Sequence, residues 1–215
     1  MSDFQLEEVR HLYDRRAPFY DSIVATLSLG KDGRYRKKAV EALEIGPAHR
    51  VLDVGCGTGL NFSRLPSHVV GIDPSAGLLR IARRRAKRLA MGTGQSLPFP
   101  DASFDRVLST YVLTTVPDWP RALNEMARVL RPGGRLVLTD DRLPPGWFLG
   151  PGPMFRKIFG EGWTDIHRGI VDEFRTVCTD VTLRFFHFGL IYLVSGVRKP
   201  GDSEAPPGPP PTPSR

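Results

Sequence analysis

The 215-residue chain is long enough for one α/β domain with a sizeable core, and too short for two ordinary domains. Its two cysteines make neither a disulfide framework nor a metal cluster, and the acidic N-terminal stretch and the lack of a long apolar run exclude a signal peptide and a membrane span. We therefore expect a cytoplasmic protein, peripheral to a membrane at most. The net charge of +7 favours negatively charged surroundings, which could be nucleic acid, an anionic membrane or solvent.

Helical segments are predicted before the first strand. Apolar residues recur at helical spacing from Phe4 to Tyr13, and Pro18 then breaks the helix within an aromatic segment, residues 13–21. A basic segment, residues 30–38, precedes a helix with apolar residues at 39–43. We expect residues 1–45 to form a helical part of their own ahead of the main domain.

A glycine-rich stretch follows, in which an apolar run, Val51–Val54, is expected to be a strand buried on both faces. Alternate glycines allow a tight turn and leave N–H groups bare for a ligand. A dinucleotide site needs a third glycine where this chain has Leu60, so the pattern disfavours a pyrophosphate. Asp53, inside the end of this strand, would repel a diphosphate but could receive an ammonium group directly or through water. The ligand contacts predicted here are Asp53, Gly55, Cys56, Gly57 and Gly59.

A second acid ends the next buried strand. Residues 69–73 finish at Asp73, 20 residues beyond Asp53. A carboxylate at this place in a nucleotide-binding half accepts hydrogen bonds from a ribose diol. An amino acid together with a ribose describes S-adenosylmethionine. The segment resembles motif I and the following acidic motif of the class I S-adenosylmethionine-dependent methyltransferases; a tight turn with a buried Asp cap is the alternative explanation.

Two helices are predicted on either side of the second strand. One is short, from about Leu60 to Leu65, and the other is capped by Ser75. Pro74 and Leu78 are expected cofactor contacts, with Leu78 packed against one adenine face. The basic run 83–88 is expected to continue the second helix as its solvated face. Because no aromatic residues alternate with these cations, we expect no nucleic-acid partner.

Residues 92–99 resemble the family's third motif, which usually reads G-D-A-E-x-L-P-F. Thr93 stands where an aspartate normally accepts the adenine amino group, and Gln95 stands where a glutamate is common. A threonine hydroxyl still accepts one hydrogen bond, and the Gly94 N–H can donate to a ring nitrogen. Adenine binding is therefore retained, at a cost on the order of 1 kcal/mol.

The next elements extend a parallel sheet. A fourth strand over 106–110 brings Ser109–Thr114 to the carboxyl edge, where open parallel sheets bind ligands, so these positions are expected to face the methyl group. A helix from about Trp119 to Leu130 is closed by residues 131–134 and leads to a fifth strand, 136–139.

Residues on the acceptor side follow the fifth strand. Asp140 and Asp141 could orient or deprotonate an acceptor, or could be ordinary polar residues that end a strand. Leu143–Phe159 is apolar but broken by Pro and Gly, which suits an irregular cover over an acceptor pocket. Contact with a membrane surface, with the body of the protein or with another copy would suit the same composition.

A helix over 169–178 and an antiparallel pair of strands, 181–188 and 190–195, complete the pattern. The predicted fold class is α/β: a Rossmann-like, seven-stranded, mostly parallel sheet with helices on both faces and an antiparallel C-terminal strand. This methyltransferase domain is expected to span residues 46–199. The segment 200–215, rich in Pro, Gly and Ser, is expected to be a disordered tail.

The N-terminal part is similar to that of the ubiquinone/menaquinone-biosynthesis and phospholipid N-methyltransferases, in which a Y-D-x-x-A-x-x-Y-D-like string forms a lid over the cofactor. The resemblance implies that residues 1–45 form such a lid, that Arg36 holds the cofactor's carboxylate and that Tyr20 lines the methyl-transfer channel. Tyr13 and Arg34 are further lid candidates. Aromatic packing and a basic helix start explain the same residues without a lid.

The resemblance implies methyl transfer from S-adenosylmethionine to a small-molecule or lipid-like acceptor. We favour an amine, because no strong base constellation is visible and the last two strands look closest to those of phospholipid N-methyltransferases. C-methylation of a prenylated quinol is the alternative acceptor chemistry. A non-catalytic adenosyl-binding regulator is the alternative outside the enzyme class. The sequence specifies neither a metal nor an oligomeric state.

Overall fold

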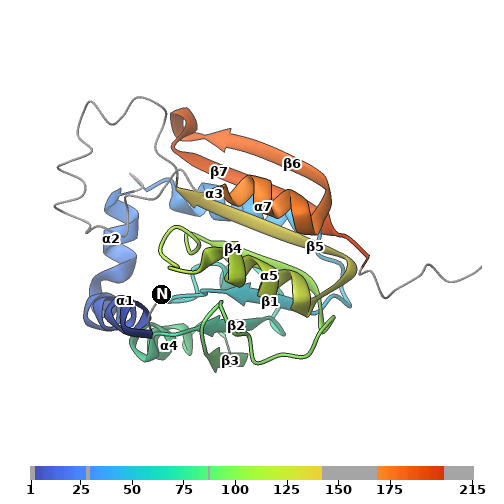
Figure 1. Cartoon of the computed structure of the whole chain (residues 1–215). Coiled ribbons are helices and arrows are strands. Elements are labelled where there is room, and N and C mark those ends of the chain that lie inside the picture. Colours follow the sequence, from blue (N-terminus) through green and yellow to red (C-terminus); the bar gives the residue numbers. More distant parts are fainter. Residues whose placement is uncertain (1–2, 28–29, 87, 142–168, 201–215) are drawn as a thin grey trace, which may run out of the picture.

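The computed structural model describes residues 3–27, 30–86, 88–141 and 169–200. A seven-stranded sheet in the order β3-β2-β1-β4-β5-β7-β6 lies at its centre (Figure 1). The first five strands are parallel, and β7 pairs antiparallel with both β5 and β6, which confirms the predicted fold class. The strands are Val51–Val54 (β1), Val70–Asp73 (β2), Arg88–Met91 (β3), Phe104–Thr110 (β4), Leu130–Asp141 (β5), Cys178–Phe186 (β6) and Ile191–Arg198 (β7).

Helices cover both faces of the sheet, as Figure 1 shows for α5 in front and α3 behind. Successive side chains of a strand point to opposite faces, so Val51 joins one core cluster with Ala39 of α3, whereas Leu52 joins the other with Leu123 of α5. The helices are Asp3–Arg16 (α1), Tyr20–Leu27 (α2), Asp32–Ala42 (α3), Ala76–Ala82 (α4), Trp119–Val129 (α5) and Ile170–Val177 (α7).

The strand order reverses at β1, and this reversal positions the site. In the register, Asp53 of β1 lies between Gly71 of β2 and Leu108 of β4. The loops that leave β1 and β4 therefore diverge at the carboxyl edge, and such a divergence opens a crevice in parallel α/β sheets.

Three local predictions are wrong. The helix expected over Leu60–Leu65 is a single 3₁₀ turn, Phe62–Arg64. The basic run 83–88 does not continue a helix, because α4 ends at Ala82 and Arg88 already opens the edge strand β3, which is held by main-chain pairing with β2. Residues 131–134 belong to β5 rather than to a helix end.

The N-terminal 45 residues occupy two places. Helix α3 packs on the sheet through Ala39 and Leu43, both fully buried. Helices α1 and α2 lie at the carboxyl edge instead, and α1 contacts α4 (Figure 1). The predicted cover, 143–159, and the predicted tail beyond residue 200 lie outside the described residues. In the described part of the chain, no helix is long and apolar enough to cross a membrane.

Candidate active site

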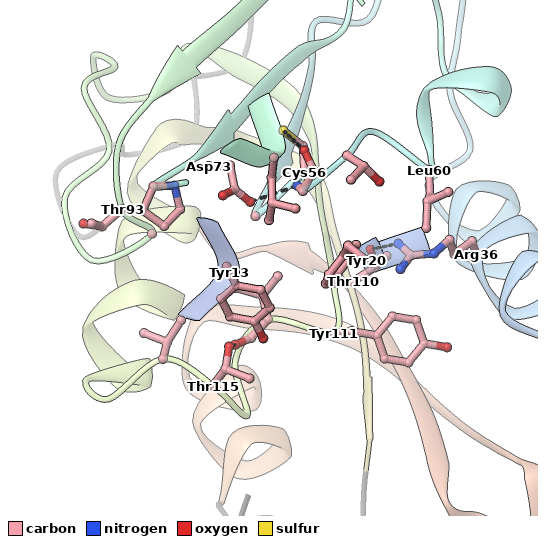
Figure 2. Close-up of a pocket in the computed structure, with 18 of the residues that line it drawn as sticks. Tyr13, Tyr20, Arg36, Cys56, Leu60, Asp73, Thr93, Thr110, Tyr111 and Thr115 are labelled. Atoms are coloured by element: carbon pink, nitrogen blue, oxygen red, sulfur yellow. Dashed lines mark hydrogen bonds between the residues drawn. The ribbon is translucent and has the colours of Figure 1, made fainter. Parts of the chain in front are cut away.

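A pocket opens at the carboxyl edge, between the glycine loop after β1 and the helices α1 and α2 (Figure 2). The space in it, together with its open mouth, is about 830 Å³. The predicted site residues that line it are Tyr13, Tyr20, Arg36, Gly55, Cys56, Gly57, Asp73, Pro74, Leu78, Thr93, Gly94 and Gln95. Of the range Ser109–Thr114, which was expected to face the methyl group, Thr110, Tyr111 and Val112 line it. Residues that line it without having been singled out include Thr58, Thr115 and Val116.

Five predicted site residues do not line the pocket: Asp53, Gly59, Ser109, Asp140 and Asp141. Three of them are almost fully buried, with exposed fractions of 0% for Asp53 and 2% for Ser109 and Asp140. Asp53, Ser109 and Asp140 can therefore act on a ligand only through their neighbours.

The glycine loop brings bare main chain to the pocket. Gly55 has a φ of +68°, and a Cβ there would lie 2.3 Å from the Val112 side chain, so only glycine fits. Gly57 has a φ of +55°, and a Cβ there would meet only the Tyr20 ring, at 3.8 Å. Its N–H donates to Asp73 Oδ2 over 2.8 Å, which joins the loop to the end of β2.

Asp73 is a pocket carboxylate with acceptor capacity left over. Its two oxygens each accept one main-chain N–H, from Gly57 at 2.8 Å and from Ser75 at 2.9 Å. A carboxylate has about four acceptor positions, so the remaining ones can receive a vicinal diol. Burial raises the pKa of Asp73 to about 6, against the two N–H bonds, and the group is ionised at neutral pH. The residue fits the ribose of S-adenosylmethionine.

Arg36 lies at the opposite end of the pocket from Thr93 (Figure 2). Its Nε donates to Asp32 Oδ2 over 2.6 Å and its Nη1 donates to Thr110 Oγ1 over 2.6 Å. The guanidinium carbon lies 5.0 Å from the centre of the Tyr111 ring. These contacts fix the guanidinium, and within the described residues no hydrogen bond from Nη2 is found, so that this nitrogen can donate to a carboxylate.

Asp53 is placed behind this network. Its carboxylate accepts from Asn61 Nδ2 at 3.1 and 3.2 Å, and Asn61 Oδ1 accepts from Arg36 Nη1 at 3.3 Å. Burial raises the pKa of Asp53 to about 7, opposed by the Asn61 hydrogen bond and the Arg36 charge. The sequence analysis missed Asn61 and Asp32; the i, i+4 spacing of Asp32 and Arg36 was the available signal for the second.

Two tyrosines of the N-terminal helices cover the pocket. The rings of Tyr13 and Tyr20 meet edge to face, with centroids 5.9 Å apart. Burial raises the pKa of both phenols above the ordinary value, so both stay protonated at neutral pH. Tyr20 can therefore shape the channel, as predicted from the family resemblance, but it cannot serve as a base.

Two aspartates tie these helices to the loops beneath them. Asp14 of α1 accepts from Ser75 Oγ at 2.5 Å and from the Gly77 N–H at 2.8 Å, at the start of α4. Asp21 of α2 accepts from Thr58 Oγ1 at 2.5 Å and from Arg85 Nη2 at 2.8 Å. On one side, therefore, the pocket is closed by helices that side-chain hydrogen bonds attach to the loops at the carboxyl edge.

The two acceptor-side aspartates differ in their environments. Asp140 accepts from the Thr114 N–H at 3.1 Å, from Thr114 Oγ1 at 2.8 Å and from the Asp141 N–H at 2.9 Å, so it holds the loop after β4. Burial, together with the charges of Asp140 and Asp32 and against that of Arg36, raises the pKa of Asp141 to about 7. Asp141 lies close enough to Tyr111 for its charge to raise the pKa of that phenol.

Tyr111 follows β4 in a strained conformation. Its φ is +61°, which a non-glycine residue rarely adopts. Its hydroxyl is buried, and it has no hydrogen-bond partner among the described residues. Strained residues with unpaired polar groups cluster where a protein contacts a ligand.

A family model described as "Methyltransferase domain" matches residues 52–138. The demethylmenaquinone methyltransferase of Listeria welshimeri is 32% identical over 188 residues, which cover 77% of this chain and 79% of that protein. The chain belongs to the class I S-adenosylmethionine-dependent methyltransferases of the quinone-biosynthesis group. The demethylmenaquinone methyltransferase of Renibacterium salmoninarum is 37% identical over 164 residues, with 74% and 67% covered.

Solved structures show the same fold for this methyltransferase. An S-adenosylmethionine-dependent methyltransferase from Thermotoga maritima has a TM-score of 0.70 and 24% identity, with 88% of this chain and 99% of that chain covered. A geranyl diphosphate methyltransferase in complex with S-adenosylmethionine has a TM-score of 0.60 and 19% identity, with 78% and 85% covered. The predictions of an enzyme and of its cofactor are confirmed. The expectation of an amine acceptor finds no support in the two demethylmenaquinone methyltransferases. The Thermotoga maritima structure is described as a "possible histamine N-methyltransferase", but at 24% identity that likeness shows the fold alone.

Proposed function

We propose that this methyltransferase transfers a methyl group from S-adenosylmethionine to a ring carbon of a demethylated, prenylated quinol. The observation that carries the proposal is the similarity to demethylmenaquinone methyltransferases across 77% of the chain. The structure adds a chemical reason: Asp141 ends β5 near enough to Asp32 and to the pocket residue Arg36 for their charges to act on its pKa, which burial raises to about 7.

The acceptor chemistry decides which groups are needed. When bound, S-adenosylmethionine supplies an electrophilic methyl group on its sulfonium. A quinol carbon becomes a good nucleophile once the neighbouring hydroxyl has lost its proton, whereas an amine need only be neutral. Asp141, with its pKa near 7, is our candidate for the base, and the Tyr111 hydroxyl is our candidate for the group that positions the quinol oxygen.

The remaining pocket residues are assigned to the cofactor. Asp73 receives the ribose hydroxyls, and Arg36 receives the carboxylate through its spare donor. Leu78, which is 3% exposed and lines the pocket, packs against the adenine, with Gly94 beside it. In this assignment, Tyr20 and the residues after β4 would face the transferred methyl group.

The acceptor can be tested directly with S-adenosylmethionine that carries a deuterated methyl group. The protein would be incubated with a demethylmenaquinol and, in parallel, with phosphatidylethanolamine, and the lipid extracts would be analysed by mass spectrometry and NMR. We expect one deuterated methyl group on the quinol ring carbon. Label found only on the phosphatidylethanolamine nitrogen would reject the proposal in favour of the amine.

The role of Asp141 has its own test, the substitution Asp141→Asn. An amide cannot accept the hydroxyl proton, so kcat should fall by roughly a hundredfold or more, with S-adenosylhomocysteine affinity unchanged. In the parent protein kcat should rise with pH through about 7, the pKa of Asp141, and this dependence should be absent from the variant. Asp172→Asn, at a side chain that is 83% exposed, is the matched control. Equal kcat values in the two variants would remove Asp141 from the mechanism.

A further inference from the structure

The large apolar side chains that the described residues expose are four: Phe19, Met91, Phe185 and Phe188, with exposed fractions of 68%, 67%, 48% and 96%. They come from distant parts of the chain. Single exposed apolar residues are common on protein surfaces, but several gathered on one face indicate an interaction surface.

The sheet register places three of these side chains at one edge. Met91 ends β3 opposite Asp73, the pocket carboxylate at the end of β2. Phe185 and Phe188 lie at the turn between β6 and β7, where Phe186 pairs with Ile191. Ile191 in turn pairs with Asp141, the last residue of β5. All three therefore lie at the carboxyl edge of the sheet, where the pocket opens.

Phe19 belongs to the same edge. It lies in the 3₁₀ turn Ala17–Phe19 between α1 and α2, and that turn contacts the start of α4, where a Cβ on Gly77 would lie 3.2 Å from Ala17 Cβ. Figure 1 shows α1, α2 and the β6–β7 turn on the same side of the molecule. The turn that carries Phe19 and the turn that carries Phe188 therefore both lie at the carboxyl edge.

The β6–β7 turn holds Phe188 out into solvent. His187 and Phe188 have φ values of 51° and 57°, a left-handed conformation that is costly for both residue types. The base of the turn is fixed on α3, because the Tyr35 hydroxyl lies 3.3 Å from His187 Nδ1 and Lys38 Nζ lies 5.4 Å from the centre of the Phe186 ring. A strained turn that projects an aromatic ring has no role in the core.

The charges at this edge are positive. Arg15 and Arg16 precede Phe19, and Lys31 and Arg34 lie at the start of α3; all four are exposed. Of the neighbouring acids, Asp21 and Asp32 form ion pairs with Arg85 and Arg36, whereas Asp14 accepts hydrogen bonds from the uncharged Ser75 and Gly77. Aromatic side chains flanked by cations match the interface of an anionic lipid bilayer.

We propose that the carboxyl edge is a docking surface for an anionic lipid bilayer, in which Phe19 and Phe188 enter the interface and the four cations contact the headgroups. The pocket mouth then faces the lipid, and a lipid-like acceptor reaches it without crossing water. The proposal holds for a quinol and for a lipid amine alike, so it stands apart from the acceptor proposed above.

Flotation with vesicles tests the surface without any acceptor present. The full chain would be mixed with vesicles of phosphatidylcholine alone or of phosphatidylcholine with phosphatidylglycerol. We expect binding to the anionic vesicles only, weakened by salt. Phe188→Asn suits the left-handed turn and removes the ring, and should lower the partition constant by about tenfold. Phe188→Trp should retain binding.

Charge reversal provides the matched control. The double variant Lys31→Glu and Arg34→Glu should abolish binding to the vesicles. The double variant Arg84→Glu and Arg88→Glu makes the same change in net charge, but Arg88 begins β3, at the end of the strand away from the carboxyl edge. This variant should keep most of the binding. Thermal unfolding and S-adenosylhomocysteine affinity report whether each variant is folded.

Three results would overturn the proposal. One is equal binding of the parent protein to neutral and anionic vesicles, or binding to neither. Another is unchanged binding of the folded Phe188→Asn variant. The third is a dimer in sedimentation that this substitution dissociates, because the surface would then belong to a second copy of the chain.

Discussion

At the scale of single residues, two carboxylates that look alike in the sequence have different places. Asp53 and Asp73 both end buried strands, yet only Asp73 lines the pocket, whereas Asp53 contacts Asn61 behind it. The strand and glycine pattern was sufficient to place Asp73 at the pocket, and its contact with a ligand stays a prediction. It could not separate direct from indirect contact for Asp53, because that depends on Asn61 and Arg36, which lie 8 residues after Asp53 and 17 residues before it in the chain.

Asp73→Asn should weaken S-adenosylhomocysteine binding by about 2 kcal/mol, roughly thirtyfold in Kd, because a charge-assisted pair of hydrogen bonds to the ribose is lost. Isothermal titration calorimetry would measure it. Asp172→Asn serves again as the exposed control and should bind normally. Binding by Asp73→Asn within twofold of the parent protein would place the ribose elsewhere.

The same carboxylate should make cofactor binding depend on pH. The pKa of Asp73 is raised to about 6, so its ionised form, which accepts the ribose hydroxyls, is lost as the pH falls through 6. We expect the S-adenosylhomocysteine Kd to be constant from about pH 7 to 8 and to rise below about pH 6. The dependence should be much weaker in Asp73→Asn, and an equal dependence in both proteins would assign it to another group.

At the scale of elements, the strongly patterned segments were predicted and the weakly patterned ones were not. The buried strands β1 and β2 and the helix α5 follow from their apolar periodicity. The edge strand β3, R-L-A-M, lacks β-branched residues and is half exposed, so it exists because β2 offers main-chain partners. Local patterns cannot show such a tertiary cause.

The N-terminal helices α1 and α2 illustrate the same limit for function. A lid was inferred from family resemblance, but Asp14 and Asp21, which hold the helices down, were not identified, because their partners lie between 37 and 64 residues away. We propose that α1 and α2 are the lid and that these hydrogen bonds keep it closed.

Releasing the lid should accelerate ligand exchange. In the double variant Asp14→Asn and Asp21→Asn, we expect S-adenosylhomocysteine to dissociate about threefold to tenfold faster, with faster amide exchange in α1 and α2. Stopped-flow fluorescence and hydrogen exchange would measure the two effects. Glu7→Gln, at an exposed ion pair on α1, is the control. Unchanged dissociation in the double variant would mean that these bonds do not gate the pocket.

At the scale of the whole molecule, the buried carboxylates of the site lower the stability of the cofactor-free fold at neutral pH. Asp53, Asp73 and Asp141 have pKa values raised to about 7, 6 and 7 by burial, above the ordinary value near 4. The folded state therefore holds protons that the unfolded chain releases. The stability from these groups is complete below about pH 4 and is lost as the pH rises through 6 to 7.

Without cofactor, the melting temperature should fall between pH 5 and pH 8. Asp14 and Glu125, whose pKa values are lowered by hydrogen bonds, oppose this trend only at more acidic pH. Circular dichroism would follow the transition. Asp53→Asn, which removes one of the buried titrating groups, should flatten the profile. A melting temperature that rises over this range would contradict the assignment of these groups.

The most direct measurement is a crystal structure with S-adenosylhomocysteine. We expect the ribose hydroxyls within hydrogen-bond distance of Asp73, the carboxylate on Arg36 and the sulfur directed towards Tyr111. Density for the ligand outside the pocket, or a ribose without contact to Asp73, would contradict the account at its centre.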